Sequence, residues 1–336
     1  MQINRQGVEA PRHVQGAAMS AKDGLKVVIP GGTGQLGHYL SREFRARGHQ
    51  VVILSRDHRT DPEAIQWDGR TMGSWAEEID GSDVVINLAG RSVNCRYTDA
   101  NLHEMMASRV DSTRAVGVAI ERATRPPKVW LQMSTATIYA HRYDAANDEA
   151  TGIIGGDESG VPDYWSFSID IAKAWELAQY EADTPQTRKV ALRTAMVMGG
   201  YPGGVFDVLV GLTRQYLGGS IAGGRQFVSW IHQRDFVRAI EFLISRDDIQ
   251  GPVNLVAPNP VTQREFMATL RRALRKRVGL PATKWMVQIG AAFMKTDTEL
   301  ILKSRRVIPK LLLDAGFSFE FANWESAAAD LANRGS

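Results

Sequence analysis

Cysteine is almost absent from this 336-residue chain, which carries Cys95 alone. A single cysteine can form no disulfide within the chain, and a reducing compartment is the expectation that follows. The sequence also shows no secretory hydrophobic segment and no apolar stretch long enough to span a bilayer. We therefore expect a cytoplasmic protein without a membrane partner.

A large excess of one charge is missing as well, since 40 Lys and Arg residues against 37 Asp and Glu residues leave a net charge of +3. One basic cluster, residues 271–277, falls on a predicted helix and is better explained by a solvated helix face than by nucleic-acid binding. No group of Cys, His and carboxylate residues has the spacing of metal ligands. We expect neither a nucleic-acid partner nor a metal.

What the chain does contain is a glycine-rich loop between an apolar run, Leu25–Ile29, and a helical pattern that begins at His38. In such a loop Gly31 permits a sharp turn, Gly34 lets backbone approach a phosphate, and Gly37 lets the helix pack against the strand. The free amides at the helix start then favour the phosphate. A dinucleotide site is preferred over an ordinary tight turn. The predicted cofactor-binding residues of the loop are Gly31, Gly32, Thr33, Gly34, Gln35, Leu36 and Gly37.

The choice of cofactor depends on the position about 20 residues downstream of the loop, where an acidic residue normally binds the ribose of NAD. Here that position carries Ser55 and Arg56, directly after the predicted strand Val51–Leu54. A guanidinium suits a 2′-phosphate in charge and geometry. The sequence therefore favours NADP(H), with NADPH as the bound form, over NAD(H). In the alternative interpretation Arg56 is a solvated loop cation and Asp57 binds the ribose.

Apolar strands alternate with helical patterns along the chain, which predicts a parallel sheet with right-handed crossovers and helices on both faces. The fold class is α/β, a Rossmann-type doubly wound parallel sheet with a smaller C-terminal α/β substrate lobe. The predicted strands are Leu25–Ile29, Val51–Leu54, Val84–Leu88, Val129–Met133, Val190–Leu192 and Val253–Val256. The predicted helices are His38–Arg47, Asn101–Ala123, Ser166–Ala182, Arg234–Ser245, Gln263–Arg277 and Ser304–Asp314.

Two glycine-rich stretches, residues 199–204 and 218–224, interrupt this alternation, and the chain is expected to leave the sheet there and to return to it with Phe227–His232. Ligands of doubly wound folds bind at the carboxyl edge from which these excursions start. The predicted organisation is a mobile leader at residues 1–24, a Rossmann domain at 25–200 plus 228–257, and a substrate lobe at 201–227 plus 258–330.

Several longer motifs follow one another in a fixed order between about Leu25 and Phe321. They are the glycine loop, Asn87-Leu88-Ala89-Gly90, Ser134-Thr135-Ala136-Thr137-Ile138-Tyr139, Arg193-Thr194, and His232 with Asp235. Narrower motifs are residues 108–114, 224–232, 256–262 and 306–310. In these motifs the chain resembles the extended short-chain dehydrogenase/reductase superfamily, and within it an epimerase-like family that carries its own C-terminal domain.

The resemblance implies further cofactor contacts. Leu88, Ala89 and Gly90 would lie beside the nicotinamide ribose, although a plain strand exit is the alternative. Trp67 and Asp68 would flank the adenine, with Asp68 accepting a hydrogen bond from the adenine amine, and a surface turn aspartate is the alternative. Arg109, in a Ser-Arg signature, would face the cofactor or an anionic substrate, and a structural role is equally open.

Catalysis in the superfamily combines a Ser or Thr that binds the substrate oxygen with a Tyr that moves the proton and a Lys four residues later, which lowers the Tyr pKa. Thr135 matches the Ser/Thr member, and the alternative is a hydroxyl satisfied by local backbone. Counting back from Glu176 places Ser168 and Ala172 where Tyr and Lys belong. The proton-transfer pair is therefore missing.

Substitute groups lie nearby in the sequence, since Tyr164 precedes Ser168 by one helical turn and Lys173 follows Ala172. Tyr139 and Asp170 are further candidates. The function that follows is an NADP(H)-dependent oxidoreductase or epimerase-like enzyme for a small polar substrate, anionic if the nearby arginines contact it. The alternative is a catalytically weak or inactive NADP(H)-binding regulatory protein. A homodimer is left open by the resemblance.

Overall fold

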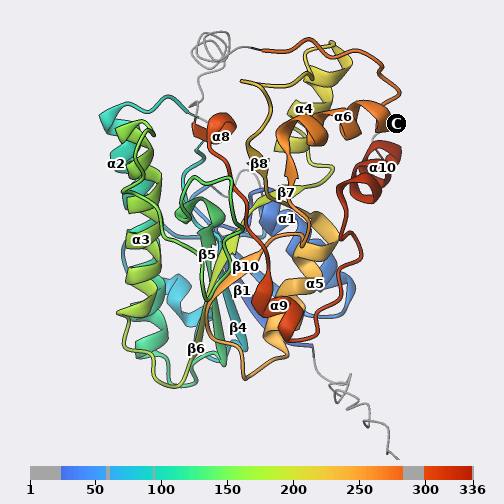
Figure 1. Ribbon diagram of the computed structural model, residues 1–336. Coiled ribbons are helices and arrows are strands. Elements are labelled where there is room, and N and C mark those ends of the chain that lie inside the picture. Colours follow the sequence, from blue (N-terminus) through green and yellow to red (C-terminus); the bar gives the residue numbers. More distant parts are fainter. Residues whose placement is uncertain (1–23, 58–60, 94, 283–298, 335–336) are drawn as a thin grey trace, which may run out of the picture.

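The computed structural model describes residues 24–57, 61–93, 95–282 and 299–334. Its centre is a seven-stranded parallel sheet in the order β10-β6-β5-β4-β1-β2-β3 (Figure 1). The strands are β1 Lys26–Pro30, β2 Gln50–Ser55, β3 Ile65–Gln66, β4 Val84–Asn87, β5 Val129–Thr135, β6 Arg188–Thr194 and β10 Gly251–Leu255. All six predicted strands are confirmed, and the Rossmann-type order starts at β1 and reverses between β3 and β4. The short edge strand β3 was not predicted.

Helices cover both faces of the sheet, with α2 and α3 on one side and α1 and α5 on the other (Figure 1). The longer helices are α1 Gln35–Ala46, α2 Asp99–Arg122, α3 Ser166–Tyr180, α4 Val205–Arg214, α5 Gln233–Ile244, α6 Gln263–Ala273 and α10 Trp324–Arg334. The short ones are α8 Glu299–Leu302, α9 Lys310–Asp314, and the 3-10 turns η1 Ser74–Glu78, η2 Ala136–Ile138 and η3 Asp163–Trp165. Neither α4 nor α10 was predicted. Within the described ranges no helix has the length and apolar character needed to cross a membrane.

The sheet is buried on both faces, which explains why its strands read as continuous apolar runs in the sequence. In β1, Val27 and Ile29 pack in the core that also holds Phe236 of α5. Val28 points to the opposite core, with Val116 of α2 and Trp130 of β5. Successive side chains of one strand thus fix helices on both sides.

The predicted return of Phe227–His232 to the main sheet is wrong. Strand β8 (Phe227–Val228) pairs with β11 (Val261–Thr262), and β9 (Trp230–His232) pairs with β7 (Met196–Met198). These two small sheets belong with α4, α6 and α10, because Trp230 is fully buried and its ring centroid lies 5.0 Å from that of Trp324. Trp230 therefore packs in the core of the lobe, whereas Ile231 packs in the core beneath the main sheet, so the segment lies between the two without joining the sheet.

The predicted helix Ser304–Asp314 is also wrong over its first half, since α9 begins only at Lys310. Backbone amides of the preceding residues donate to distant groups: Arg305 to the Phe227 carbonyl at 2.9 Å and Ile308 to the Asn147 carbonyl at 2.9 Å. These tertiary hydrogen bonds replace the helical ones.

The hydrophobic cores of the sheet and of the lobe do not follow the predicted domain boundaries closely. Trp230, from the predicted Rossmann segment, packs in the core of the lobe. Leu312, from the predicted lobe segment, packs in the core of the sheet. The boundaries therefore stay a prediction, and the predicted leader lies outside the described residues apart from Gly24.

Candidate functional site

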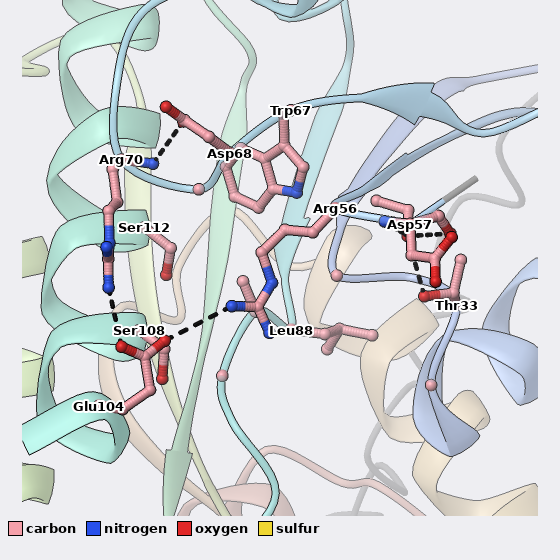
Figure 2. A pocket seen from close by; sticks show the side chains of 16 residues that line it. Thr33, Arg56, Asp57, Trp67, Asp68, Arg70, Leu88, Glu104, Ser108 and Ser112 are labelled. Atoms are coloured by element: carbon pink, nitrogen blue, oxygen red, sulfur yellow. Dashed lines mark hydrogen bonds and ion pairs between the residues drawn. The ribbon is translucent and has the colours of Figure 1, made fainter. Parts of the chain in front are cut away.

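A pocket of about 290 Å³ opens at the carboxyl ends of β1, β2 and β4 (Figure 2). This edge is where doubly wound folds bind their ligands. Predicted cofactor residues that line it are Gly31, Thr33, Gly34, Ser55, Arg56, Asp68, Leu88, Ala89 and Gly90. Trp67, expected beside the adenine, and Asp57, the alternative ribose ligand, also line it. Lining residues that the sequence did not indicate are Gly69, Arg70, Glu104, Ser108 and Ser112.

The glycine loop has the geometry that a phosphate cradle needs. Gly31 adopts a φ of +75°, and a Cβ there would lie 2.7 Å from the Ala89 backbone nitrogen. A Cβ on Gly37 would lie 2.1 Å from the Gly32 carbonyl oxygen, so glycine alone lets α1 approach the loop this closely. Gly34 differs, because its Cβ would have no neighbour nearer than 4.0 Å, and α1 starts there without a side-chain cap. The uncapped helix start faces the pocket, as an anion site requires.

The rest of the predicted loop lies behind this cradle. Gln35 donates from Nε2 to the Tyr39 hydroxyl at 3.0 Å, and Leu36 packs against the core of the sheet. Phosphate binding by the loop itself stays a prediction.

At the end of β2, Ser55 is buried and its Oγ lies 3.3 Å from Oγ1 of Thr33, which joins the two predicted cofactor segments. Arg56 extends into the pocket, where its Nη1 lies 3.6 Å from Oε1 of Glu104 (Figure 2). Glu104, on α2, also accepts a hydrogen bond from Nη2 of Arg70 at 2.9 Å. Two guanidinium groups therefore share one carboxylate at this end of the pocket. Glu104 lies almost fifty residues from Arg56 in sequence, and no local pattern pointed to it.

Asp68 lines the pocket, but its carboxylate is used by the turn that follows. It accepts hydrogen bonds from the Arg70 amide at 2.8 Å, the Thr71 amide at 2.8 Å and the Thr71 hydroxyl at 2.5 Å. The Thr71 hydrogen bonds hold the pKa of Asp68 below its ordinary value. These contacts fit the alternative of a turn aspartate, and the adenine contact stays a prediction.

Arg109 lies behind the pocket wall. Its buried guanidinium donates to the carbonyls of Met105 at 2.9 Å and Arg91 at 3.0 Å, and its Cζ lies 4.9 Å from the ring centroid of Trp175. Burial lowers the pKa of Arg109 to about 10. A Cβ on Gly90 would lie only 3.3 Å from Arg109 Cγ, so the arginine supports the loop that lines the pocket. Direct contact with the cofactor stays a prediction that these contacts do not favour.

The predicted catalytic residues are not gathered in one place. Thr135 ends β5, and its Oγ1 accepts a hydrogen bond from the Thr137 amide at 3.1 Å, as the alternative of a locally satisfied hydroxyl expects. Tyr164 is 47% exposed in η3, and Lys173 is exposed on α3. Tyr139 is buried and bonded to Arg193 and Asn254 at 3.0 Å each, and burial raises its pKa. Their catalytic roles stay predictions.

Ser168, at the position where the resemblance expects a tyrosine, donates to Oε2 of Glu299 at 2.5 Å. Glu299 is fully buried and lies 3.5 Å from Nζ of Lys303, which in turn donates to the Thr137 carbonyl at 2.9 Å. Burial lowers the pKa of Lys303. The C-terminal segment thus places a buried carboxylate and a buried lysine beside α3 and η2, where the sequence lacks the expected catalytic pair. Within α3 itself no signal indicated them.

No cluster of three or more His, Cys, Asp or Glu residues able to hold a metal ion occurs in the part of the chain that the structure describes.

Residues 27–256 match the NAD dependent epimerase/dehydratase family. The chain belongs to this family. Residues 282–331 match a domain of unknown function, DUF1731, in agreement with the expected C-terminal domain. Among curated relatives, the epimerase family protein YfhF of Bacillus subtilis is 30% identical over 91% of this chain and 98% of its own length. The human epimerase family protein SDR39U1 is 30% identical over 91% of this chain and 99% of its own.

Solved structures agree with this membership of the epimerase/dehydratase family. A crystal structure of human SDR39U1 (isoform 2) with NADPH has a TM-score of 0.80 at 30% identity and covers 91% of this chain and 99% of that one. The nucleoside-diphosphate sugar epimerase of Corynebacterium glutamicum has a TM-score of 0.72 at 25% identity and covers 93% and 59%. A dTDP-glucose 4,6-dehydratase from Streptomyces venezuelae, with NAD bound, shares the fold at 16% identity and a TM-score of 0.70. The NADPH of the human relative agrees with the cofactor preference inferred from Arg56.

Proposed function

We propose that this chain binds NADP(H) in the pocket at the carboxyl edge of the sheet and uses it in the oxidoreduction or epimerisation of a small polar molecule in the cytoplasm. The observation that carries the proposal is Arg56, which extends into the pocket from the end of β2, where an acidic ribose ligand would select NAD. The NADPH bound to the human relative supports it.

The residues of the pocket fit such a cofactor. The uncapped start of α1 at Gly34 would hold the pyrophosphate, and the Arg56 guanidinium, which lines the pocket, would pair with the 2′-phosphate. The backbone at Leu88–Gly90 passes beside the nicotinamide ribose. Bound NADPH would supply a hydride to a substrate carbonyl carbon, and bound NADP+ would take one from the carbon that bears a substrate hydroxyl. In either direction Thr135 would orient the substrate oxygen.

A second function, an NADP(H)-binding regulatory protein, is favoured by one observation. The hydroxyl groups expected nearest the chemistry are already engaged, Thr135 with the Thr137 amide and Ser168 with Glu299. A protein that binds the cofactor without turnover needs no free acid at this point.

NADPH oxidation with a panel of aldehydes and ketones, followed by absorbance, separates an NADPH-dependent oxidoreductase from the regulatory protein. We expect turnover in the wild type and a rate lower by about a hundredfold in Thr135→Ala, within the range for loss of one hydrogen-bond donor at the reacting oxygen. Thr135→Ser, which keeps the hydroxyl, should retain most of the rate. Normal turnover in Thr135→Ala would remove Thr135 from the mechanism, and tight NADPH binding without turnover in the wild type would favour the regulatory function.

A further inference from the structure

The adenosine end of the pocket contains an internal anion. Glu104 holds Arg56 at 3.6 Å through one carboxylate oxygen and Arg70 at 2.9 Å through the other (Figure 2). The three side chains come from β2, the loop after β3, and α2, and all three line the pocket. Their side chains are 58%, 50% and 27% exposed for Arg56, Arg70 and Glu104.

The other groups around this carboxylate are committed elsewhere. Ser108 Oγ accepts from the Arg91 amide at 2.9 Å, and Ser112 Oγ donates to the Arg109 carbonyl at 3.0 Å. Asp111, two turns beyond Glu104 along α2, lies 3.5 Å from Nε of Arg70. Arg70 therefore keeps a carboxylate partner on α2 if Glu104 moves away.

We propose that Glu104 is a resident counterion that occupies the place of the 2′-phosphate until NADPH enters, and that Arg70 is the second guanidinium of that subsite. This inference rests on the proposed function only in taking this pocket as the NADPH site. A phosphate monoester carries a charge of about −1.5 to −2 near neutral pH, more than a carboxylate, and pairs with guanidinium groups in the same forked geometry.

The exchange is possible because the Glu104 ion pairs are between partly exposed side chains, and such pairs contribute little to stability. Once the phosphate is bound, however, Glu104 is a like charge beside it and opposes binding. Glu104 thus lowers the affinity for NADPH, and Arg70 raises it, while neither acts on NADH.

The test measures dissociation constants of the full chain for NADPH and NADH by nucleotide fluorescence, and for 2′,5′-ADP and 5′-AMP by calorimetry. For Glu104→Gln we expect NADPH and 2′,5′-ADP to bind about three- to tenfold more tightly. For Arg70→Ala we expect both to bind about tenfold more weakly. Changes of this size correspond to the gain or loss of one exposed charge contact. NADH and 5′-AMP should bind each variant as they bind the wild type. Matched controls are Glu325→Gln and Arg272→Ala, an exposed pair 3.9 Å apart outside the pocket, which should change none of the four constants.

Three results would overturn the inference. If Glu104→Gln weakens the binding of NADH and leaves the affinity for NADPH unchanged, Glu104 is a ribose ligand instead. If both variants leave all four constants unchanged, Glu104 and Arg70 form only a surface ion pair. If the wild type binds NADPH and NADH equally, no 2′-phosphate subsite exists. Failure of the wild type to bind either dinucleotide would instead refute the proposed function itself.

Discussion

Arg109 is a buried cation that fastens the loop lining the pocket. Replacing it by alanine removes hydrogen bonds to the carbonyls of Met105 and Arg91 and the contact with Trp175. The Met105 carbonyl keeps the Ser108 hydroxyl as a donor, so the larger loss is at the Arg91 carbonyl. We expect Arg109→Ala to lower the free energy of unfolding by about 2–4 kcal/mol. Urea unfolding followed by circular dichroism measures this.

Arg109→Ala should also weaken the binding of NADPH and of NADH by equal factors, since the loop at Gly90 is expected to contact the part that both nucleotides share. Arg109→Lys should restore little, because a single ammonium cannot reproduce the planar fork that reaches both carbonyls. A loss confined to NADPH would contradict this account and would place Arg109 at the 2′-phosphate.

At the scale of elements, the junction between β1 and α1 depends on two glycines in different ways. A Cβ on Gly37 would collide with the Gly32 carbonyl. A Cβ on Gly34 would collide with nothing, because its nearest neighbour would be 4.0 Å away. We expect Gly37→Ala to destabilise the fold by about 3 kcal/mol, as overpacking against backbone does. Gly34→Ala should leave the unfolding free energy within about 1 kcal/mol, the range for an N-cap change.

Gly34→Ala should impair nucleotide binding even though it leaves stability nearly unchanged. The variant keeps its fold but places a methyl group where we expect the pyrophosphate. Titration of both dinucleotides should then show a loss of about tenfold or more in affinity, independent of the 2′-phosphate. Unchanged binding by folded Gly34→Ala would mean that the phosphates do not approach the chain at this point.

The elements that the sequence predicts well are those fixed by burial on both sides. Strands such as β4 are apolar at nearly every position, so their pattern shows the sheet directly. By contrast, β3 and β8 have two residues each and carry no periodicity. Residues 304–309 have a sequence compatible with helix, and their amides instead bond to residues far along the chain. Local patterns contain no information about such partners.

At the scale of the whole molecule, His232 links α5 to α10. Its Nδ1 accepts from the Arg234 amide, its Nε2 lies 3.2 Å from Asp330, and its ring stacks on Phe321 at 3.9 Å. Burial lowers its pKa from 6.5 to about 4, so the folded protein keeps it neutral while the unfolded chain takes up a proton below pH 6.5. The contribution of His232 to the free energy of unfolding is therefore fully present above pH 6.5 and is lost as the pH falls toward 4.

We expect the unfolding free energy to fall by about 3 kcal/mol between pH 6.5 and pH 4 from this group alone. In His232→Asn, which keeps an acceptor for the Arg234 amide, the unfolding free energy should depend less steeply on pH over this window. The difference in slope should correspond to the uptake of up to one proton on unfolding. Urea midpoints across the window measure both proteins. Parallel pH profiles would show that His232 titrates at its ordinary pKa in the folded protein.

Some residues of the candidate site can be predicted from their local sequence, whereas others depend on contacts between distant segments. The glycine loop, Ser55 and Arg56 each follow a strand within a few residues, so the sequence places them at one edge of the sheet. The Arg70–Glu104 pair and the contact of Ser168 with Glu299 join segments 34 and 131 residues apart. Their partners are set by how α2 and the C-terminal segment pack, which only the three-dimensional structure shows.

Arg56 is the residue that we propose makes this pocket a site for the 2′-phosphate of NADP(H). Its role can be measured by fluorescence titration of the wild type and Arg56→Ala with NADPH and NADH. We expect the wild type to bind NADPH at least about tenfold more tightly than NADH, and Arg56→Ala to lose this preference while its affinity for NADH is unchanged. Equal affinities of the wild type for the two dinucleotides would show that Arg56 does not bind a 2′-phosphate.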